Sequence, residues 1–338
     1  MTKGKVIKIA VDAMGGDYAP SETVEGAVDA AKSGDVEIGL VGDLDAVNAE
    51  MAKHDTEGLP ITIIPSEGVV LEGESPALAL RRKPRSSILV STGLVKQGQA
   101  DAAVTMGSTG AAMAAAAVIL GVIEGVERPA LGGPIVGLAP RTVVLDLGSN
   151  VDCRPTQMLS FAVIGHVLAR SLWGIESPRI ALLSVGGESG KGNKIVQETT
   201  PLLLKSGLNF VGNVEANDLP QGVVEVAVCD GFVGNVVMKL TEGFGSAMVD
   251  HLRKNLGDKL SEDDMEALTT DVYEVNNVSE TWGGGPLLGV NGVSVVGHGR
   301  AKAGSVCRAI ETAKRFVQAG FVEGLNKELV QVRHRVGG

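Results

Sequence analysis

Short apolar runs rich in β-branched residues alternate along the chain with longer stretches of helical period. The short runs predict strands, because β-branched side chains favour pleated, buried backbone. The predicted strands are Val6–Asp12, Val36–Val41, Ile61–Ile64, Ala102–Thr105, Thr142–Leu147, Arg179–Val185, Phe210–Val214, Val224–Cys229 and Val293–Val296. Helices are predicted between most of them, for example over Ser21–Lys32, Ser108–Glu124, Pro155–Leu172 and Ile195–Lys205. Alternating β and α units predict an α/β fold with a doubly wound, mostly parallel sheet.

No linker-like stretch divides the chain, so we expect a single α/β domain over residues 1–338. Residues 242–282 differ from the rest, because they are charged and amphipathic and contain no strand-like run. They predict a helical excursion from the sheet. The pentapeptide FVGNV occurs twice; its first copy, Phe210–Val214, predicts a strand that runs into a loop, and the second, Phe232–Val236, predicts the start of a helix.

Composition refines this picture. Apolar residues make up 44% of the chain and aromatic residues only 3%, so Ala, Val, Leu and Ile must build the core, as is typical of parallel sheets between helices. The net charge of −10 argues against nucleic acid as a partner, because phosphate backbones require clustered Lys and Arg.

Three features predict a cytoplasmic protein without a membrane span. Cys153, Cys229 and Cys307 are widely spaced and suggest buried, reduced thiols. The N-terminus leads directly into a predicted strand, without a signal peptide. The most apolar segment, Ala111–Ile123, is shorter than the ~20 residues that a membrane span needs.

The stretch LLSVGGESGKGNK, from Leu182 to Lys194, superficially resembles a nucleotide-binding P-loop. That motif needs a glycine where Val185 stands and a Ser or Thr where Gly192 stands. Both features are missing, so the loop is predicted to hold another anion or none.

Glycine-rich segments follow six of the predicted strands: DAMGGDYAPSE, MGSTGAA, DLGSNVD, GGESGKGN, CDGFVGN and GHGRA. In a doubly wound sheet the carboxyl ends of parallel strands share one edge, where ligands bind. Glycines let backbone N–H groups approach an anion, and the following helix N-termini add partial positive charge. Together the segments predict a site for an anionic ligand.

The polar residues of these loops suggest different roles. Lys191, among glycines, is placed to meet a phosphate as a mobile charge, or it is simply solvated. Asp12, Asp146 and Asp230 could bind Mg²⁺, but capping helices and orienting amides is the favoured interpretation. Four glycine-adjacent asparagines and one histidine are further candidates: Asn150, Asn193, Asn213, Asn235 and His298.

The sequence contains no GxSxG elbow, no cysteine in a reactive motif and no GxGxxG before the first helix. A reaction in which phosphate itself is the nucleophile needs none of them. The protein would only hold phosphate, align an electrophile and stabilise a developing oxyanion.

The motifs VDAMGGDYAP, KPRSSILVSTGLVKQGQADAAVTMGSTGA, LDLGSNVDC, LLSVGGESGKGN, CDGFVGNVVMKLTEG and GGGPLLGVNG resemble, in order, those of the bacterial phosphate acyltransferases of phospholipid synthesis. The resemblance runs from about Val6 to about Gln318. It implies a fold like those of isopropylmalate dehydrogenase and phosphotransacetylase, and transfer of a fatty acyl group from acyl carrier protein to inorganic phosphate without a cofactor or metal. It also implies a cytoplasmic homodimer, attached peripherally to the inner face of the membrane, where a glycerol-3-phosphate acyltransferase uses the acyl phosphate.

The resemblance also implies site residues. The expected catalytic residues are Lys191, Asn193, Asn235 and His298. The expected phosphate- or substrate-binding residues are Asp12, Gly15, Gly16, Asp17, Gly107, Ser108, Thr109, Gly110, Asn150, Asn213, Asp230 and Lys239. The chain departs from the family pattern at Ser108, where Asn is usual, and at Arg300, where Ser is usual.

The carrier protein and the membrane are negatively charged surfaces, so an acidic chain needs a local basic patch to dock to them. The densest cluster is Arg81, Arg82, Lys83 and Arg85, followed by Arg253 and Lys254 on the helical excursion.

Two other functions stay open: an NAD-dependent dehydrogenase of the isopropylmalate type, and a non-catalytic anion-binding scaffold.

Overall fold

The computed structural model describes residues 6–337, apart from the side chains of Ala77 and Ser279. Contacts divide the described chain into two compact units. The single α/β domain expected over 1–338 stays a prediction, and its terminal residues 1–5 and 338 lie outside the described part. Unit 1 comprises residues up to 124 together with 282–323, and unit 2 comprises 125–281 and 324 onward. Composition could not reveal the division, because the chain crosses between the units without a linker-like stretch.

Unit 1 is a doubly wound sheet with the strand order β3-β2-β1-β4-β11-β10. Its elements are β1 (Ile7–Asp12), α1 (Ser21–Ala31), β2 (Val36–Gly42), α2 (Leu44–Met51), β3 (Ile61–Pro65), α3 (Pro76–Arg82), α4 (Ser87–Lys96), β4 (Ala102–Thr105), α5 (Thr109–Ala115), β10 (Gly285–Leu288), β11 (Val293–Val296) and α11 (Ala303–Gln318). Strands β3, β2, β1, β4 and β11 are parallel, and β10 pairs antiparallel with β11.

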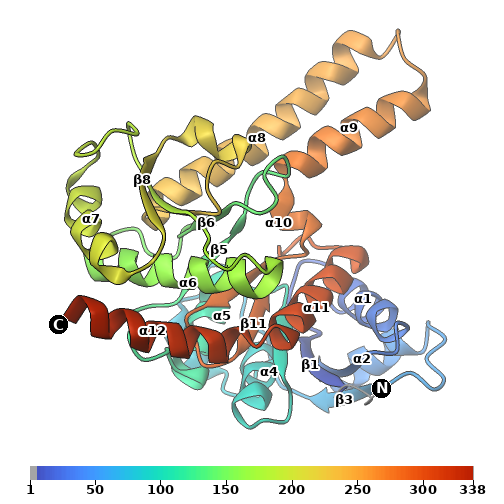
Figure 1. The fold of residues 1–338 in the computed structure, drawn as a ribbon. Coiled ribbons are helices and arrows are strands. Elements are labelled where there is room, and N and C mark those ends of the chain that lie inside the picture. Colours follow the sequence, from blue (N-terminus) through green and yellow to red (C-terminus); the bar gives the residue numbers. More distant parts are fainter. Residues whose placement is uncertain (1–5, 338) are drawn as a thin grey trace, which may run out of the picture. The chain divides into compact units, whose positions relative to one another are not determined.

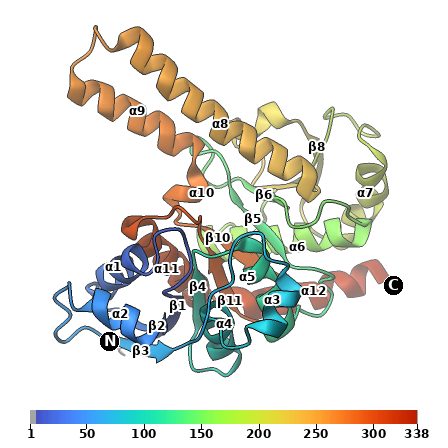
Figure 2. The same cartoon turned by 180° about the vertical axis from the view of Figure 1, so that it is seen from behind.

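Two groups of helices pack against this sheet. Helices α1 and α11 pack on each other and on the sheet (Figure 1). Helix α4 packs against β1 and β4, and α5 packs against α3 and α4 (Figure 2). Helix α5 continues as a wider π-helical turn, Ala116–Leu120, and ends at Gly121, so the helix predicted over Ser108–Glu124 is shorter and irregular.

In unit 2 the strands have the order β5-β6-β9-β7-β8. Its elements are β5 (Ala130–Pro134), β6 (Val143–Leu145), α6 (Pro155–Trp173), β7 (Ile180–Leu183), α7 (Lys194–Ser206), β8 (Phe210–Val214), a 3-10 helix (Ala216–Gln221), β9 (Val226–Val228), α8 (Gly231–Leu256), α9 (Glu262–Asn276) and α10 (Val278–Thr281); α12 (Phe321–Gly337) begins in unit 1 and continues into unit 2. Strand β5 is antiparallel to β6, and the other pairs are parallel.

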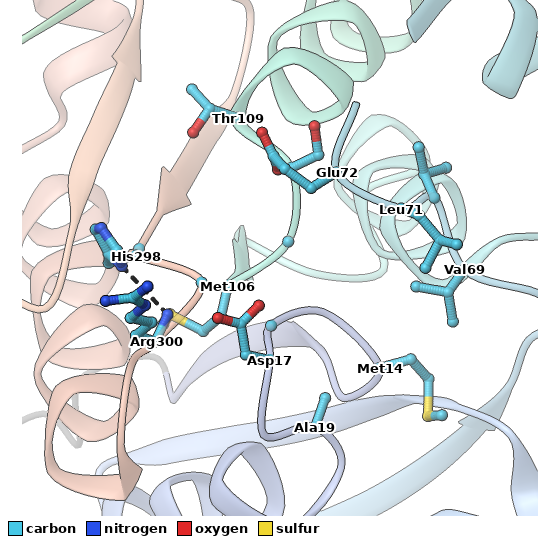
Figure 3. A pocket seen from close by; sticks show the side chains of 16 residues that line it. Met14, Asp17, Ala19, Val69, Leu71, Glu72, Met106, Thr109, His298 and Arg300 are labelled. Atoms are coloured by element: carbon cyan, nitrogen blue, oxygen red, sulfur yellow. Dashed lines mark hydrogen bonds between the residues drawn. The ribbon is translucent and has the colours of Figure 1, made fainter. Parts of the chain in front are cut away.

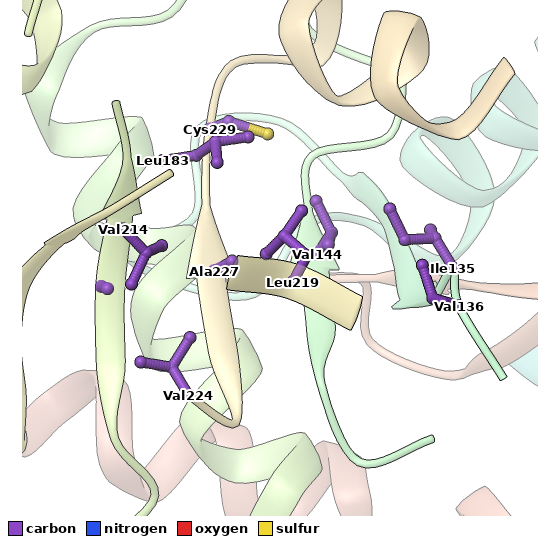
Figure 4. Close-up of a cluster of buried hydrophobic side chains, with 10 residues drawn as sticks. Ile135, Val136, Val144, Leu183, Val214, Leu219, Val224, Ala227 and Cys229 are labelled. Atoms are coloured by element: carbon purple, nitrogen blue, oxygen red, sulfur yellow. The ribbon is translucent and has the colours of Figure 1, made fainter. Parts of the chain in front are cut away.

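The core of unit 2 is aliphatic, as the composition predicts. A cluster of buried side chains between the sheet and its covering elements includes Val144, Leu183, Val214, Leu219 and Cys229 (Figure 4). Helix α8 packs on this cluster through Val233, Val237 and Met238. Of the three free cysteines only Cys229 is buried; Cys153 and Cys307 are half-buried, contrary to our expectation.

Residues 242–282 contain helices and, among the described residues, no strand, as their pattern predicts. The end of α8 and α9 form an antiparallel pair that extends away from the sheet of unit 2 (Figure 1). Both copies of FVGNV adopt the predicted structures, β8 and the first turns of α8. Strands β5 and β10 were not predicted, because the sequences ALGGP and GPLL are rich in glycine and proline.

Candidate active site

Three strand ends meet at one edge of the unit 1 sheet. Strands β1, β4 and β11 are adjacent and parallel, so their carboxyl ends point the same way. The following loops are joined by backbone bonds: Asp17 N donates to Gly299 O (2.7 Å), and Gly297 N donates to Thr105 O (2.9 Å). The predicted gathering of glycine-rich loops at a sheet edge is therefore present in unit 1.

The Asp12 side chain holds together the loop after β1 and the end of β4. Its carboxylate is buried and accepts hydrogen bonds from Thr105 Oγ1 (2.7 Å) and Met14 N (3.1 Å). A side chain on Gly15 would collide with Asp12 and with Gly107 N, so only glycine fits there. Burial raises the pKa of Asp12, and the bond from Thr105 opposes this shift. Asp12 therefore orients the loop, which agrees with the favoured interpretation of this residue; its expected place among the binding residues stays a prediction.

A cavity of about 550 Å³ opens above these loops. It is lined by Met14, Gly16, Asp17, Ala19, Val69, Val70, Leu71, Glu72, Met106, Gly107, Ser108, Thr109, Gly297, His298, Gly299 and Arg300. Figure 3 shows His298 and Arg300 on one side of the cavity, and Val69, Leu71 and Met14 on the other. The cavity thus has a polar wall and an apolar wall.

The contacts of its loop favour one neutral tautomer of His298. Arg300 N donates to its Nδ1 (3.2 Å; dashed in Figure 3), and Ala301 N donates to its carbonyl oxygen (2.9 Å). Because Nδ1 accepts a hydrogen bond, the neutral ring carries its proton on Nε2. His298 therefore presents a hydrogen-bond donor.

The predicted amide cradle Gly107–Gly110 is only partly available. Gly107 N donates to Thr105 Oγ1 (3.0 Å), so this amide is already satisfied. Ser108 is buried and caps α5 by accepting from Ala111 N (3.4 Å). Thr109 and Gly110, at the start of α5, are exposed and remain as candidate donors for a ligand.

In unit 2, Asp146 plays the part that Asp12 plays in unit 1. Its fully buried carboxylate accepts from the backbone N–H of Leu131 (3.2 Å), Ser149 (3.2 Å) and Asn150 (2.6 Å). It also accepts from Asn150 Nδ2 (2.9 Å), and burial raises its pKa. Asn150 Nδ2 donates in addition to Pro129 O (2.9 Å), so both of its donors are used. Asn150 is thus buried and engaged with the scaffold, and its part in substrate binding stays a prediction.

The loop between β7 and α7 holds Lys191. Gly190 and Gly192 have positive φ angles of 89° and 109°, which glycine adopts without strain. Asn213 Nδ2 braces the loop by donating to the carbonyl oxygens of Glu188 (3.3 Å) and Lys191 (3.2 Å). The ammonium of Lys191 is exposed and makes no ion pair or hydrogen bond within residues 6–337. The chain therefore builds a rigid loop and leaves this cation free.

The other asparagine and aspartate predictions separate clearly. Asn193 caps α7, because its Oδ1 accepts from Val196 N (3.2 Å). Asp230 caps α8 in the same way, accepting from Val233 N (2.9 Å). Asn235 is exposed on the first turns of α8 beside Gly148, and Lys239 pairs with Glu242 (2.6 Å). Of these four, only Asn235 keeps an uncommitted side chain in the described structure.

The predicted docking residues are also divided. Lys83 pairs with Glu74 (2.6 Å), and Arg85 with Glu67 (3.3 Å). Arg81 and Arg82, at the end of α3, are exposed and without an ion pair in the described chain. On the helical pair, Arg253 joins α8 to α9 through Glu266 (3.0 Å) and Thr269 (3.4 Å), whereas Lys254 is exposed.

Residues 6–337 contain no group of three or more His, Cys, Asp or Glu side chains arranged to hold a metal ion, leaving aside the undescribed side chains. Within the same range, no helix is both long enough and apolar enough to cross a bilayer. Sequence reasoning missed Thr105 and the segment Val69–Glu72. Thr105 ends a predicted strand, which was an available signal, whereas the segment carries no motif.

The chain was compared with known proteins. Residues 7–324 match a family described as fatty acid synthesis protein. The phosphate acyltransferase of Pelotomaculum thermopropionicum is 42% identical over 340 residues, 98% of each chain. That of Desulforamulus reducens is 43% identical over 327 residues, 96% of this chain and 98% of the relative.

Solved structures agree on the fold. A phosphotransacetylase from Streptococcus pyogenes superposes with a TM-score of 0.58 at 17% identity, covering 93% of this chain and 95% of that one. A branched-chain phosphotransacylase from Enterococcus faecalis gives 0.56 at 15% identity, covering 92% and 99%. These likenesses confirm the predicted phosphotransacetylase-like α/β fold.

The phosphate acyltransferase relatives, at 42–43% identity over nearly the whole chain, thus define the class of protein as an acyltransferase. The chain belongs to the fatty acid synthesis protein family, together with the curated phosphate acyltransferases.

Proposed function

We propose that the protein transfers a fatty acyl group from acyl carrier protein to inorganic phosphate, which yields acyl phosphate and free carrier. The observation that carries this proposal is the match of about 42% identity over 98% of the chain to a protein named phosphate acyltransferase. The family description, fatty acid synthesis protein, supports a fatty acyl donor.

The reaction requires few catalytic side chains. A phosphate oxygen attacks the thioester carbonyl, the carbonyl oxygen becomes an oxyanion, and the carbon–sulfur bond breaks as the carbonyl re-forms. The leaving group is a thiolate, and since a thiol has a pKa of about 8.5, departure needs little acid assistance. Positioning and oxyanion stabilisation are therefore the main catalytic tasks.

The uncommitted side chains fit these tasks. We assign Lys191 to phosphate, because it is a free cation on a braced glycine loop. His298 is assigned to the carbonyl oxygen, because its loop fixes Nε2 as a donor beside the cavity. Asn235, in the same unit as Lys191, is a further candidate to orient phosphate. Lys191 lies in unit 2 and His298 in unit 1, so each assignment is tested with its own variant.

The direct test supplies purified protein with a long-chain acyl-carrier thioester and phosphate. Acyl phosphate is trapped with hydroxylamine as the hydroxamate, and released carrier thiol is counted. We expect both products in equal amounts, only when phosphate is present. Thiol release without acyl phosphate would indicate a thioesterase and would contradict the proposal. The same samples with nicotinamide cofactor and 2-hydroxy acids should show no change in cofactor absorbance.

Docking of the acidic carrier is assigned to Arg81 and Arg82. They are the members of the basic cluster whose charge is not matched by a neighbouring carboxylate. Reversing both charges should raise the carrier KM several-fold and weaken its salt dependence, because screened attraction sets the encounter rate. Reversal of Arg85 alone should do less, since its charge is already matched by Glu67. Unchanged salt dependence in the double variant would remove the assignment.

A homodimer is supported by an apolar stripe on α8. Phe232, Val236, Leu240 and Phe244 recur every four residues and are 62%, 49%, 70% and 61% exposed. The same helix packs on the unit 2 core through other residues, so this stripe is left for a partner. Leu240→Glu should lower the mass measured by light scattering from dimer to monomer. A monomeric wild-type protein would contradict the proposal.

We also propose a cytoplasmic location, weak peripheral membrane attachment and delivery of the product to a glycerol-3-phosphate acyltransferase for phospholipid synthesis. The tip between α8 and α9 is polar, and Arg253 is engaged with Glu266, which leaves Lys254 and Lys259 as exposed cations without an ion pair in the described chain. Each basic residue near anionic lipid contributes about 1 kcal/mol. Binding to anionic vesicles should therefore be weak and disappear at high salt; salt-resistant binding would reveal an apolar anchor instead.

A further inference from the structure

The segment Val69–Leu71 forms the apolar wall of the unit 1 cavity, and the charged Glu72 follows it in the lining. The segment follows β3 and has no regular secondary structure. Val70 is buried, but Leu71 is 61% exposed although it lines the cavity. Figure 3 shows Val69 and Leu71 across the cavity from His298. An exposed leucine that faces a cavity is covered favourably by an apolar ligand.

A lysine clip holds this wall in place. Lys83 Nζ donates to Val69 O (2.8 Å) and to Glu74 Oε1 (2.6 Å). The same Glu74 oxygen accepts from Leu71 N (3.3 Å). The wall is therefore fastened at both sides of Val70, and the pairing with Lys83 lowers the pKa of Glu74. In this arrangement Lys83 faces the wall and not a docking partner.

The two walls together suit a ligand that is polar at one end and apolar at the other. A fatty acyl thioester has this character, because its carbonyl accepts hydrogen bonds and its chain makes only apolar contacts. The pantetheine arm of a carrier is a weaker fit, since its amides would face Val69 and Leu71 without partners.

We propose that Val69–Leu71 bind the acyl chain of the donor and that Lys83 is a positioning residue which makes the enzyme selective for long chains. The identity of the donor rests on the proposed function, but binding of the chain does not require turnover.

The first test measures binding without phosphate, using acyl-pantetheine thioesters of increasing chain length. In the wild type, each methylene that contacts the wall should raise affinity by up to about fourfold. Leu71→Asn should reduce this increment and leave acetyl-pantetheine binding unchanged. An equal loss at every length, acetyl included, would assign the wall to the pantetheine arm, and no loss at any length would show that the wall is not contacted. Either result overturns the proposal.

The second test addresses the clip. Lys83→Met should flatten the dependence of affinity on chain length and weaken long-chain binding by about tenfold, roughly the cost of one charge-assisted hydrogen bond. Lys83→Arg should restore part of the slope. Lys53→Met is the matched control, because Lys53 forms an exposed ion pair with Glu50 (2.8 Å) and does not line the cavity.

An unchanged slope in a folded Lys83→Met protein would refute the positioning role. Loss of the slope in both Lys83→Met and Lys53→Met would show a general stability effect and equally refute it. Absence of acyl phosphate from the wild type would defeat the proposed function alone, because these binding measurements involve no transfer step.

Discussion

The strand-end loops of the two units are built alike but keep different side chains free. In unit 1, Asp12 gathers the loop after β1 and, through Thr105, the loop after β4. In unit 2, Asp146 gathers the loop after β6 with three hydrogen bonds and accepts a fourth from Leu131 N of β5. What remains uncommitted differs: His298, Arg300 and an apolar wall around a cavity in unit 1, and the Lys191 ammonium and Asn235 in unit 2.

A polar residue in a glycine-rich loop is therefore a candidate for chemistry only if its hydrogen bonds are not needed by the loop itself. Asn150, Asn193 and Asn213 look like Asn235 in the sequence, but each is already engaged with the backbone. Scaffold residues and free residues should therefore fail in different ways when they are changed.

The largest effect is expected for the two scaffold aspartates, and it should fall on stability. Asp146→Ala leaves several buried donors without an acceptor, each costing about 1–3 kcal/mol, so the free energy of unfolding should drop by about 4 kcal/mol or more. Asp12→Ala should cost less, because fewer donors depend on it. Denaturant unfolding measures both. Equal losses would show that the two networks do not differ as described.

The next effect is expected at His298 and should fall on kcat. Removing a fixed hydrogen-bond donor to an oxyanion lowers kcat by about 100-fold or more. His298→Ala should show this loss with unchanged stability, and His298→Gln should recover part of it, because its amide can donate from near the position of Nε2. If Gln is no better than Ala, a donor role is wrong and proton transfer by the ring becomes the better account.

A smaller effect separates the helix cap Asn193 from a catalytic residue. Asn193→Ala should cost about 1 kcal/mol of stability through loss of the cap. Asn193→Ser should keep most of it, and the phosphate KM should move little in either variant. A large rise in phosphate KM in the capped Ser variant would return Asn193 to the catalytic residues.

The smallest effect concerns pH. Burial raises the pKa of Asp12 above its usual 3.8, so the folded state binds its proton more tightly than the unfolded state does. Its contribution to stability is present below the unfolded pKa and is lost as pH rises through the folded pKa. Measured as a difference, wild type should lose stability relative to Asp12→Asn as pH rises from about 4 to 7. A difference independent of pH would contradict the assigned shift.

Much of the fold was predictable because periodicity and β-branched runs locate parallel, buried strands. The edge pairings of β5 and β10 were not, because antiparallel strands with glycine and proline carry no such pattern. The two copies of FVGNV show the limit of local sequence: β8 pairs with β7, whereas the second copy begins α8 after the cap of Asp230. Context alone decides between them.

The strand-end loops could be predicted from the sequence, but the contacts of their side chains could not. Lys191 and His298 stay predictions, made because a cation and an imidazole among glycines have few structural uses. Lys83 could not be separated from Arg81 and Arg82, since whether a basic residue clips a loop or faces solvent depends on Glu74 and Val69, which only the folded chain brings to it. The apolar wall, Val69–Leu71, could not be predicted either, because its position depends on the same contacts with Lys83 and Glu74.

The most direct test of the distinction between free and engaged residues is the phosphate KM of Lys191→Ala. The free ammonium should be worth about 1.5–3 kcal/mol to bound phosphate, which predicts a rise of about 10- to 100-fold. The carrier KM should not change. Lys194→Ala is the matched control, because Lys194 lies close to Lys191 in the sequence and is also exposed. Its ammonium has only a long ion pair with Glu198 (3.7 Å). An unchanged phosphate KM in folded Lys191→Ala, or an equal rise in Lys194→Ala, would contradict the account.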